Sequence, residues 1–115
     1  MHNSNSRGKT FKKKLNKCKN IFYAFSELQY EYGNYLDLDN EIVEIKSNVK
    51  LIGCSLGDCY TTDFVCVKTN GDIVVIECVE KSKLLRPLVC KMLDCSRNYW
   101  LSKGVNDWMV VLGEK

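Results

Sequence analysis

The stretch "YTTDFVCVKTNGDIVVIECV", residues 60–79, constrains the fold more strongly than any other part of the chain. Two runs rich in β-branched and aromatic residues flank a Thr-Asn-Gly sequence at residues 69–71, and this combination predicts a β-hairpin. If these three residues form the loop, with Gly71 in the left-handed conformation, counting back along both strands places Asp63 directly opposite Glu77. A two-residue loop would instead turn Glu77 to the other face of the hairpin.

The predicted register brings two carboxylates together. Facing like charges oppose folding unless a cation or a proton relieves the repulsion. The strand that carries Glu77 reads "IVVIECV" and is apolar enough to be central and buried, so an unpaired carboxylate there would be costly. The alternatives are an aspartate that caps a turn and a glutamate that faces solvent. We favour a residual metal site formed by Asp63 and Glu77, with Val79 pointing to the same face as Glu77.

The remaining pattern predicts a single α/β domain. Helical spacing of apolar residues, with Ser26 as the cap, predicts a helix around residues 26–36. Two short strands are expected at 42–45 and 49–52, a long helix at 84–103, and a last strand in "DWMVVLG". The order of these elements predicts a mixed β-sheet flanked by helices.

Charge divides the chain into two parts. Residues 1–20 hold Arg7 and six lysines without an acid, which leaves 10 of the 17 basic residues and all 14 acidic residues for 21–115. We therefore expect a basic N-terminal arm at 1–20 and a folded domain at 21–115. A basic arm suggests a phosphate-bearing partner such as DNA, and a solvated tail is the alternative. The lysines expected to contact DNA are Lys12, Lys13, Lys14 and Lys17.

Apolar runs are too short to span a bilayer, and the first 20 residues lack the features of a secretory signal. We therefore expect a cytoplasmic protein without a membrane partner. Seven cysteines without a secretory signal argue against a disulfide scaffold. We expect four of them to be reduced and packed as small apolar residues: Cys66, Cys78, Cys90 and Cys95. Zinc binding is only weakly indicated, because no C-x2-C pair occurs and the single histidine is His2.

Several stretches, taken in order, resemble the catalytic domain of TnsA-type transposon-end endonucleases, within the PD-(D/E)xK restriction-endonuclease-like superfamily. The matching stretches are "SELQ", "LDLDNEIVEI", "YTTDF", "GDIVVIECV", "KMLDCSRNYW" and "DWMVVLGEK". The resemblance covers nearly all of the chain from about Gly8 onward. It implies a nuclease-like mixed sheet and, in an active member, a Mg²⁺ site that activates water for DNA cleavage.

Carried over residue by residue, the resemblance places the metal-binding acids on Asp63 and Glu77. The family's helix glutamate falls on Gln29 and its catalytic lysine falls on Val79, so both differences remove a charge. The candidates for a relocated lysine are Lys81, Lys83 and Lys91. Lys81 lies on the expected strand face, and Lys91 lies on the long helix. The resemblance thus implies a catalytic set of Asp63, Glu77 and Gln29, completed by one of these lysines.

Our leading hypothesis is a nuclease-derived binding protein that has lost cleavage. Small degenerate domains of this kind suit a phage or mobile element, as an assembly subunit or as an inhibitor of a nucleic-acid-processing or defence complex. The second hypothesis is an active Mg²⁺-dependent DNA endonuclease with a relocated lysine. The third is a structural protein similar to phage head-completion proteins. Self-association as a homo-oligomer fits the first and third hypotheses.

Overall fold

The computed structural model describes residues 2–3, 10–53 and 60–115. Its main sheet contains β4 (Ile42–Lys50), β5 (Tyr60–Lys68), β6 (Ile73–Glu80) and β7 (Asp107–Gly113), in that spatial order. The β4–β5 and β5–β6 pairs are antiparallel, whereas β6 and β7 are parallel. The short strand β1 (His2–Asn3) pairs with the start of β5. The predicted α/β class with a mixed sheet flanked by helices is confirmed.

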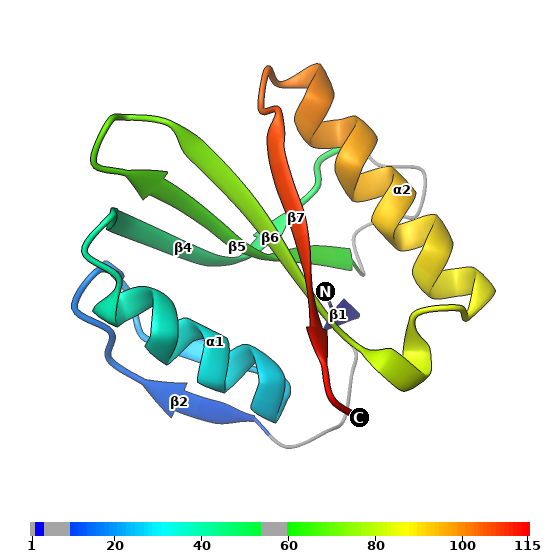
Figure 1. The fold of residues 1–115 in the computed structure, drawn as a ribbon, viewed down its shortest axis with the longest axis horizontal. Helices are drawn as coiled ribbons and strands as arrows, with labels where there is room; N and C mark the ends of the chain where they lie inside the picture. Colours follow the sequence, from blue (N-terminus) through cyan, green and yellow to red (C-terminus); the bar gives the residue numbers. More distant parts are fainter. Residues whose placement is uncertain (1, 4–9, 54–59) are drawn as a thin grey trace.

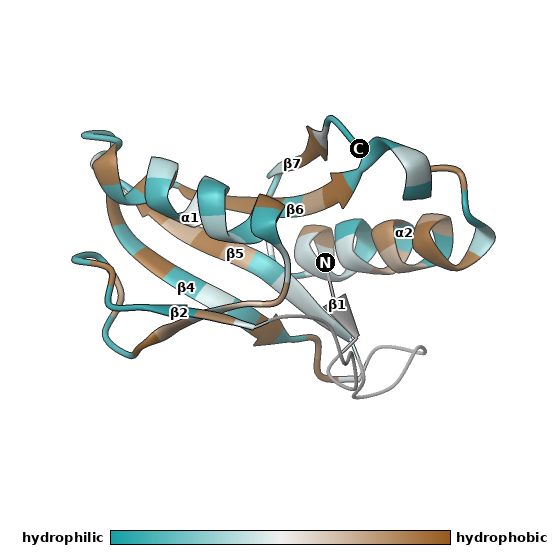
Figure 2. Ribbon diagram, turned by 90° about the horizontal axis from the view of Figure 1, so that it is seen from below, coloured by the Kyte–Doolittle hydropathy of each residue, from teal (hydrophilic) through white to brown (hydrophobic). Residues whose placement is uncertain are grey.

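Two helices cover opposite faces of the central strand β6 (Figure 1). Helix α1 spans Glu27–Leu38 and α2 spans Pro87–Ser102. Val74, Ile76 and Cys78 of β6 pack into the apolar cluster that also contains Leu36 of α1. Val79 packs into a second cluster with residues of α2. Because side chains alternate along a strand, β6 is buried on both faces, and Figure 2 shows it as mainly apolar.

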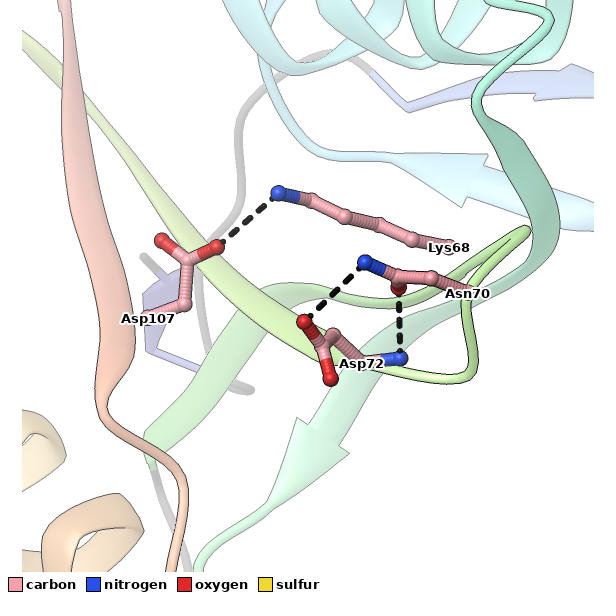
Figure 3. Close-up of polar contacts among 4 residues, drawn as sticks. All are labelled: Lys68, Asn70, Asp72 and Asp107. Atoms are coloured by element: carbon pink, nitrogen blue, oxygen red, sulfur yellow. Dashed lines mark hydrogen bonds and ion pairs between the residues drawn. The ribbon is translucent and has the colours of Figure 1, made fainter.

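The hairpin between β5 and β6 has the predicted three-residue loop. Gly71 is left-handed with φ of +89°, and the Lys68 N–H donates to the Asp72 carbonyl at 2.8 Å. Asn70 stabilises the loop by accepting from the Asp72 N–H at 2.9 Å, and Lys68 pairs with Asp107 of β7 at 3.1 Å (Figure 3). This loop sets the register of β5 against β6. The ladder pair of these strands that lies farthest from the loop joins Phe64 to Ile76.

Two expectations about element boundaries are corrected. The two short strands expected at 42–45 and 49–52 are one strand, β4, because the left-handed Asn48 (φ of +53°) does not interrupt its pairing with β5. The long helix begins at Pro87 instead of residue 84, since a residue that precedes proline is driven out of the helical conformation. A short 3₁₀ helix, η1 (Lys81–Lys83), occupies the preceding segment.

The expected boundary at residue 20 is also corrected. Strands β2 (Phe11–Lys13) and β3 (Phe22–Ala24) form a small antiparallel sheet that packs against α1. Leu15 and Cys18 are buried in the core. Residues 10–20 therefore belong to the domain, because the apolar residues among the lysines turn inward while the charged ends stay at the surface. Arg7 and Lys9 lie outside the described residues.

The cysteines only partly follow the expectation. Cys18, Cys66 and Cys78 are buried reduced thiols, and burial raises the pKa of Cys66 and of Cys78 to about 12. Cys90 is reduced but exposed, and Cys95 is disulfide-bonded, so neither is a packed thiol as predicted.

Cys54 and Cys59 fall outside the described residues. Within the described part of the chain, no three His, Cys, Asp or Glu side chains gather as a metal site would require. In the same residues, neither α1 nor α2 has the length and apolar character needed to cross a membrane.

Candidate functional site

Glu77 lies where β5 and β6 separate. The ladder between these strands ends at the Phe64–Ile76 pair, and continuing it by one residue places Asp63 opposite Glu77. Neither side chain has any exposed surface. The sequence thus predicted correctly that these two acids occupy neighbouring positions on adjacent strands.

The Glu77 carboxylate is surrounded by hydrogen-bond donors. Its Oε2 accepts from the hydroxyl groups of Tyr60 at 3.0 Å, Thr62 at 3.0 Å and Ser96 at 2.5 Å. Its Oε1 accepts from the Asp63 backbone N–H at 3.1 Å. Hydrogen bonds to an ionised acceptor are stronger than neutral ones, so these donors compensate for removing the carboxylate from water.

Two tryptophans form the next layer of this network. Trp108 of β7 donates through Nε1 to the Ser96 hydroxyl at 3.0 Å. Trp100 of α2 donates through Nε1 to the Thr62 hydroxyl at 3.0 Å. Each hydroxyl therefore accepts from an indole while it donates to Glu77. The network connects β5, β6, β7 and α2 around a single carboxylate.

The Asp63 carboxylate accepts a backbone hydrogen bond across the strands, just as the Glu77 carboxylate does. Its Oδ2 accepts from the Cys78 backbone N–H at 2.7 Å. Each acid therefore accepts a hydrogen bond from the backbone of the opposite strand, just beyond the last ladder pair. Buried peptide groups must find partners, and here side chains supply them where the strands have moved apart. Both acids thus have a clear role in holding the fold.

Burial determines the protonation behaviour of this region. It raises the pKa of Glu77, and the hydrogen bonds from Ser96, Tyr60 and Thr62 lower that pKa and offset part of the effect. Burial and the neighbouring Glu77 also raise the pKa of the Tyr60 hydroxyl, which keeps it protonated as a donor.

Gln29 is fully buried and its amide is used in the fold. Its Oε1 accepts from the Phe25 N–H at 2.9 Å, and its Nε2 donates to the Asn48 side chain at 2.8 Å. Its own N–H donates to the Ser26 hydroxyl at 3.1 Å. This pattern resembles a capping box. In that motif the side chains of the cap residue and of the residue three positions later each accept a hydrogen bond from a backbone N–H at the start of the helix. Gln29 therefore secures the start of α1 and ties it to β4.

The positions connected with the catalytic lysine lie in three different environments. Val79 is buried in the apolar cluster between the sheet and α2. Lys81 lies in η1 rather than on the strand, so its expected place on the strand face is wrong; β6 ends at Glu80. Lys91 lies on the exposed side of α2. Among the residues that the structure describes, neither ammonium group forms a hydrogen bond or an ion pair with Asp63 or Glu77.

The arrangement does not suit a hydrated Mg²⁺ ion. Mg²⁺ keeps several of its waters and binds through carboxylates that can turn an oxygen toward it. Both oxygens of Glu77 already accept hydrogen bonds, and both acids are fully buried.

The hydroxyl residues of this network were not predicted from the sequence. The sequence did contain an indication of them. Tyr60 and Thr62 are two residues apart and so share one face of β5, and Ser96 is a small polar residue on the buried side of α2.

Comparison with known proteins does not extend the assignment. No protein-family model matches the chain, and no curated protein matches it either. The resemblance to TnsA-type nucleases therefore depends on the quoted sequence stretches alone and stays a prediction.

Proposed function

We propose that this chain is a nuclease-derived protein that does not cleave DNA but binds it through the surface of the β2–β3 sheet. The supporting observation is the environment of Glu77. A metal-binding carboxylate needs a free oxygen directed at an accessible ion, whereas this one accepts three hydroxyl groups and a peptide N–H in the core. The acid therefore serves the fold, and this supports a protein that has lost metal-dependent cleavage.

The predicted DNA-binding lysines divide into two kinds. Lys14 donates to the Cys18 carbonyl at 2.7 Å, and Lys17 donates to the Asp39 carbonyl at 2.5 Å, beyond the end of α1. These two ammonium groups satisfy the protein's own backbone. Lys12 and Lys13 are exposed on opposite faces of β2. The Lys12 ammonium lies over the Tyr23 ring, and the Lys13 ammonium donates to the Asn34 side chain at 2.6 Å without using a backbone carbonyl. We assign the main phosphate contacts to Lys12 and Lys13.

A role in a phage or mobile element, as an assembly subunit or as an inhibitor of a DNA-processing complex, is part of this proposal. It follows from the resemblance and from the loss of charge at Gln29 and Val79. Such a protein would keep the nuclease framework as a rigid support and use its surface for binding. The exposed lysines of β2 are the part of that surface with the right charge for DNA.

The test combines calorimetric titration of Mn²⁺, a plasmid-nicking assay and DNA retention at several salt concentrations. We expect no Mn²⁺ binding and no nicking by the wild type. The double variant Lys12→Ala/Lys13→Ala should weaken DNA retention and reduce the salt slope by about two, since about one counterion is released per phosphate contact. Lys83→Ala, an exposed lysine on η1, is the matched control.

Mn²⁺-dependent nicking that disappears in Asp63→Asn would overturn the proposal. That result would favour the active endonuclease with a lysine supplied by another element.

A further inference from the structure

A groove separate from the Glu77 network lies between the β2–β3 sheet and β4, which we call the β3–β4 groove. Residues 18–21, 23 and 44–49 line it, and its volume is about 450 Å³. This volume lies within the range of about 300–1,000 Å³ that is typical of small-molecule sites. Figure 2 shows the small sheet running beside β4.

Hydrogen bonds close the groove at both ends. At one end the Ile45 N–H donates to the Lys17 carbonyl at 2.9 Å. At the other, the Asn48 side chain donates to the Tyr23 carbonyl at 2.7 Å. Three residues of strand span roughly 10 Å at about 3.3 Å each. An added peptide strand needs a longer free edge, so the groove suits a compact ligand.

The lining combines positive charge with an aromatic ring. Lys19 and Lys46 line the groove, and Glu44 is the acid among the lining residues. Tyr23 also lines it and keeps 41% of its surface exposed. The Lys12 ammonium lies 5.7 Å from the centre of the Tyr23 ring, which adds a further positive charge. Basic side chains around an exposed aromatic ring are the usual means of holding a phosphate and a base together.

We propose that the β3–β4 groove binds one nucleotide unit, with its phosphate at Lys19 and Lys46 and its base stacked on Tyr23. The unit is either part of a single DNA strand or a free nucleotide, because both present the same chemistry. We take a DNA strand as the first source of this nucleotide unit, and in that choice the proposal rests on the proposed function. The groove itself is defined by contacts that do not involve the Glu77 network.

The experiment measures binding of a fluorescein-labelled eight-residue oligothymidylate by anisotropy and of thymidine monophosphate by calorimetry. Lys19→Ala/Lys46→Ala should weaken oligonucleotide binding at least tenfold. Tyr23→Leu should weaken it fivefold or more, in line with stacking worth about 1–3 kcal/mol per base, and Tyr23→Phe should restore it. Lys83→Ala and Tyr35→Leu are the matched controls, since both residues are exposed outside the groove. They should stay within twofold of the wild type.

Each outcome supports or overturns one of the two proposals. If the oligonucleotide binds the groove variants as tightly as the wild type, the groove is not the site and DNA binding stands. If thymidine monophosphate binds as tightly as the oligonucleotide, the groove is a free-nucleotide site, and a DNA strand as the source of the unit is overturned. If neither ligand binds the wild type, the groove proposal is overturned, and the DNA-retention test of Lys12 and Lys13 decides the proposed function separately. Binding of an acidic peptide at Lys19 and Lys46, without nucleotide binding, would also overturn the groove proposal.

Discussion

Glu77→Ala should lower the free energy of unfolding by about 3–5 kcal/mol. The substitution removes the common acceptor of three hydroxyl groups, on Tyr60, Thr62 and Ser96, and of the Asp63 N–H. A buried donor left without a partner costs about 1–3 kcal/mol, and removing Glu77 leaves several such donors at once. Urea denaturation of wild type and variant measures this difference. Glu114→Ala, at an exposed acid, is the control and should change stability little.

Glu77→Gln allows a sharper test through its pH dependence. Burial raises the pKa of Glu77 above its ordinary value of 4.5. The folded protein therefore holds this proton more tightly than the unfolded chain does. The resulting stabilisation is fully present below the unfolded pKa and is lost as the pH rises through the folded pKa.

Glutamine does not titrate, so the advantage of the wild type over Glu77→Gln should shrink as the pH rises above about 4.5. Urea denaturation at intervals between pH 4 and pH 8 measures this difference. Parallel stability profiles would show that the pKa of Glu77 is not raised. If Glu77→Ala leaves the free energy of unfolding nearly unchanged, the network does not hold α2 to the sheet.

Phe22→Ala should lower the free energy of unfolding by about 3–5 kcal/mol, as expected for emptying a buried aromatic site. Phe22 has no exposed surface and packs against the Phe64 ring at a centroid distance of 5.6 Å. It also lies against Gly33 of α1, where an added Cβ would meet the ring at 2.5 Å and 2.7 Å. Gly33→Ala should therefore destabilise by about 1–3 kcal/mol, although alanine is the better helix former by about 1 kcal/mol.

Combining the two substitutions tests this contact directly. With the Phe22 ring removed, Gly33→Ala no longer meets an obstacle, so it should become neutral or stabilising by up to about 1 kcal/mol. The double-mutant cycle, measured by urea denaturation, should give a favourable coupling. Glu31→Ala, at an exposed position of α1, is the control for a change in helix propensity. Additive effects of the two substitutions would show that the helix can move away from the ring.

The sequence alone was sufficient for the features that depend on neighbours along the chain. The Thr-Asn-Gly stretch predicted the hairpin, and its three-residue loop, which the structure has, places Asp63 opposite Glu77. Ser26 marked the start of α1, and the apolar run from residue 107 to 113 is β7 as expected. These features follow from backbone preferences and from the alternation of side chains, which act over a few residues and can be counted.

The tertiary structure decided what these residues do. Glu77 receives its hydroxyl partners from β5 and from α2, and Gln29 bonds to Asn48, 19 residues away. Residues 10–20 are part of the domain because Leu15 and Cys18 pack in the same apolar cluster as Leu36 of α1. A residue type states which bonds a side chain can form. Which of them it forms depends on the groups that folding places around it, and on how far it is removed from water.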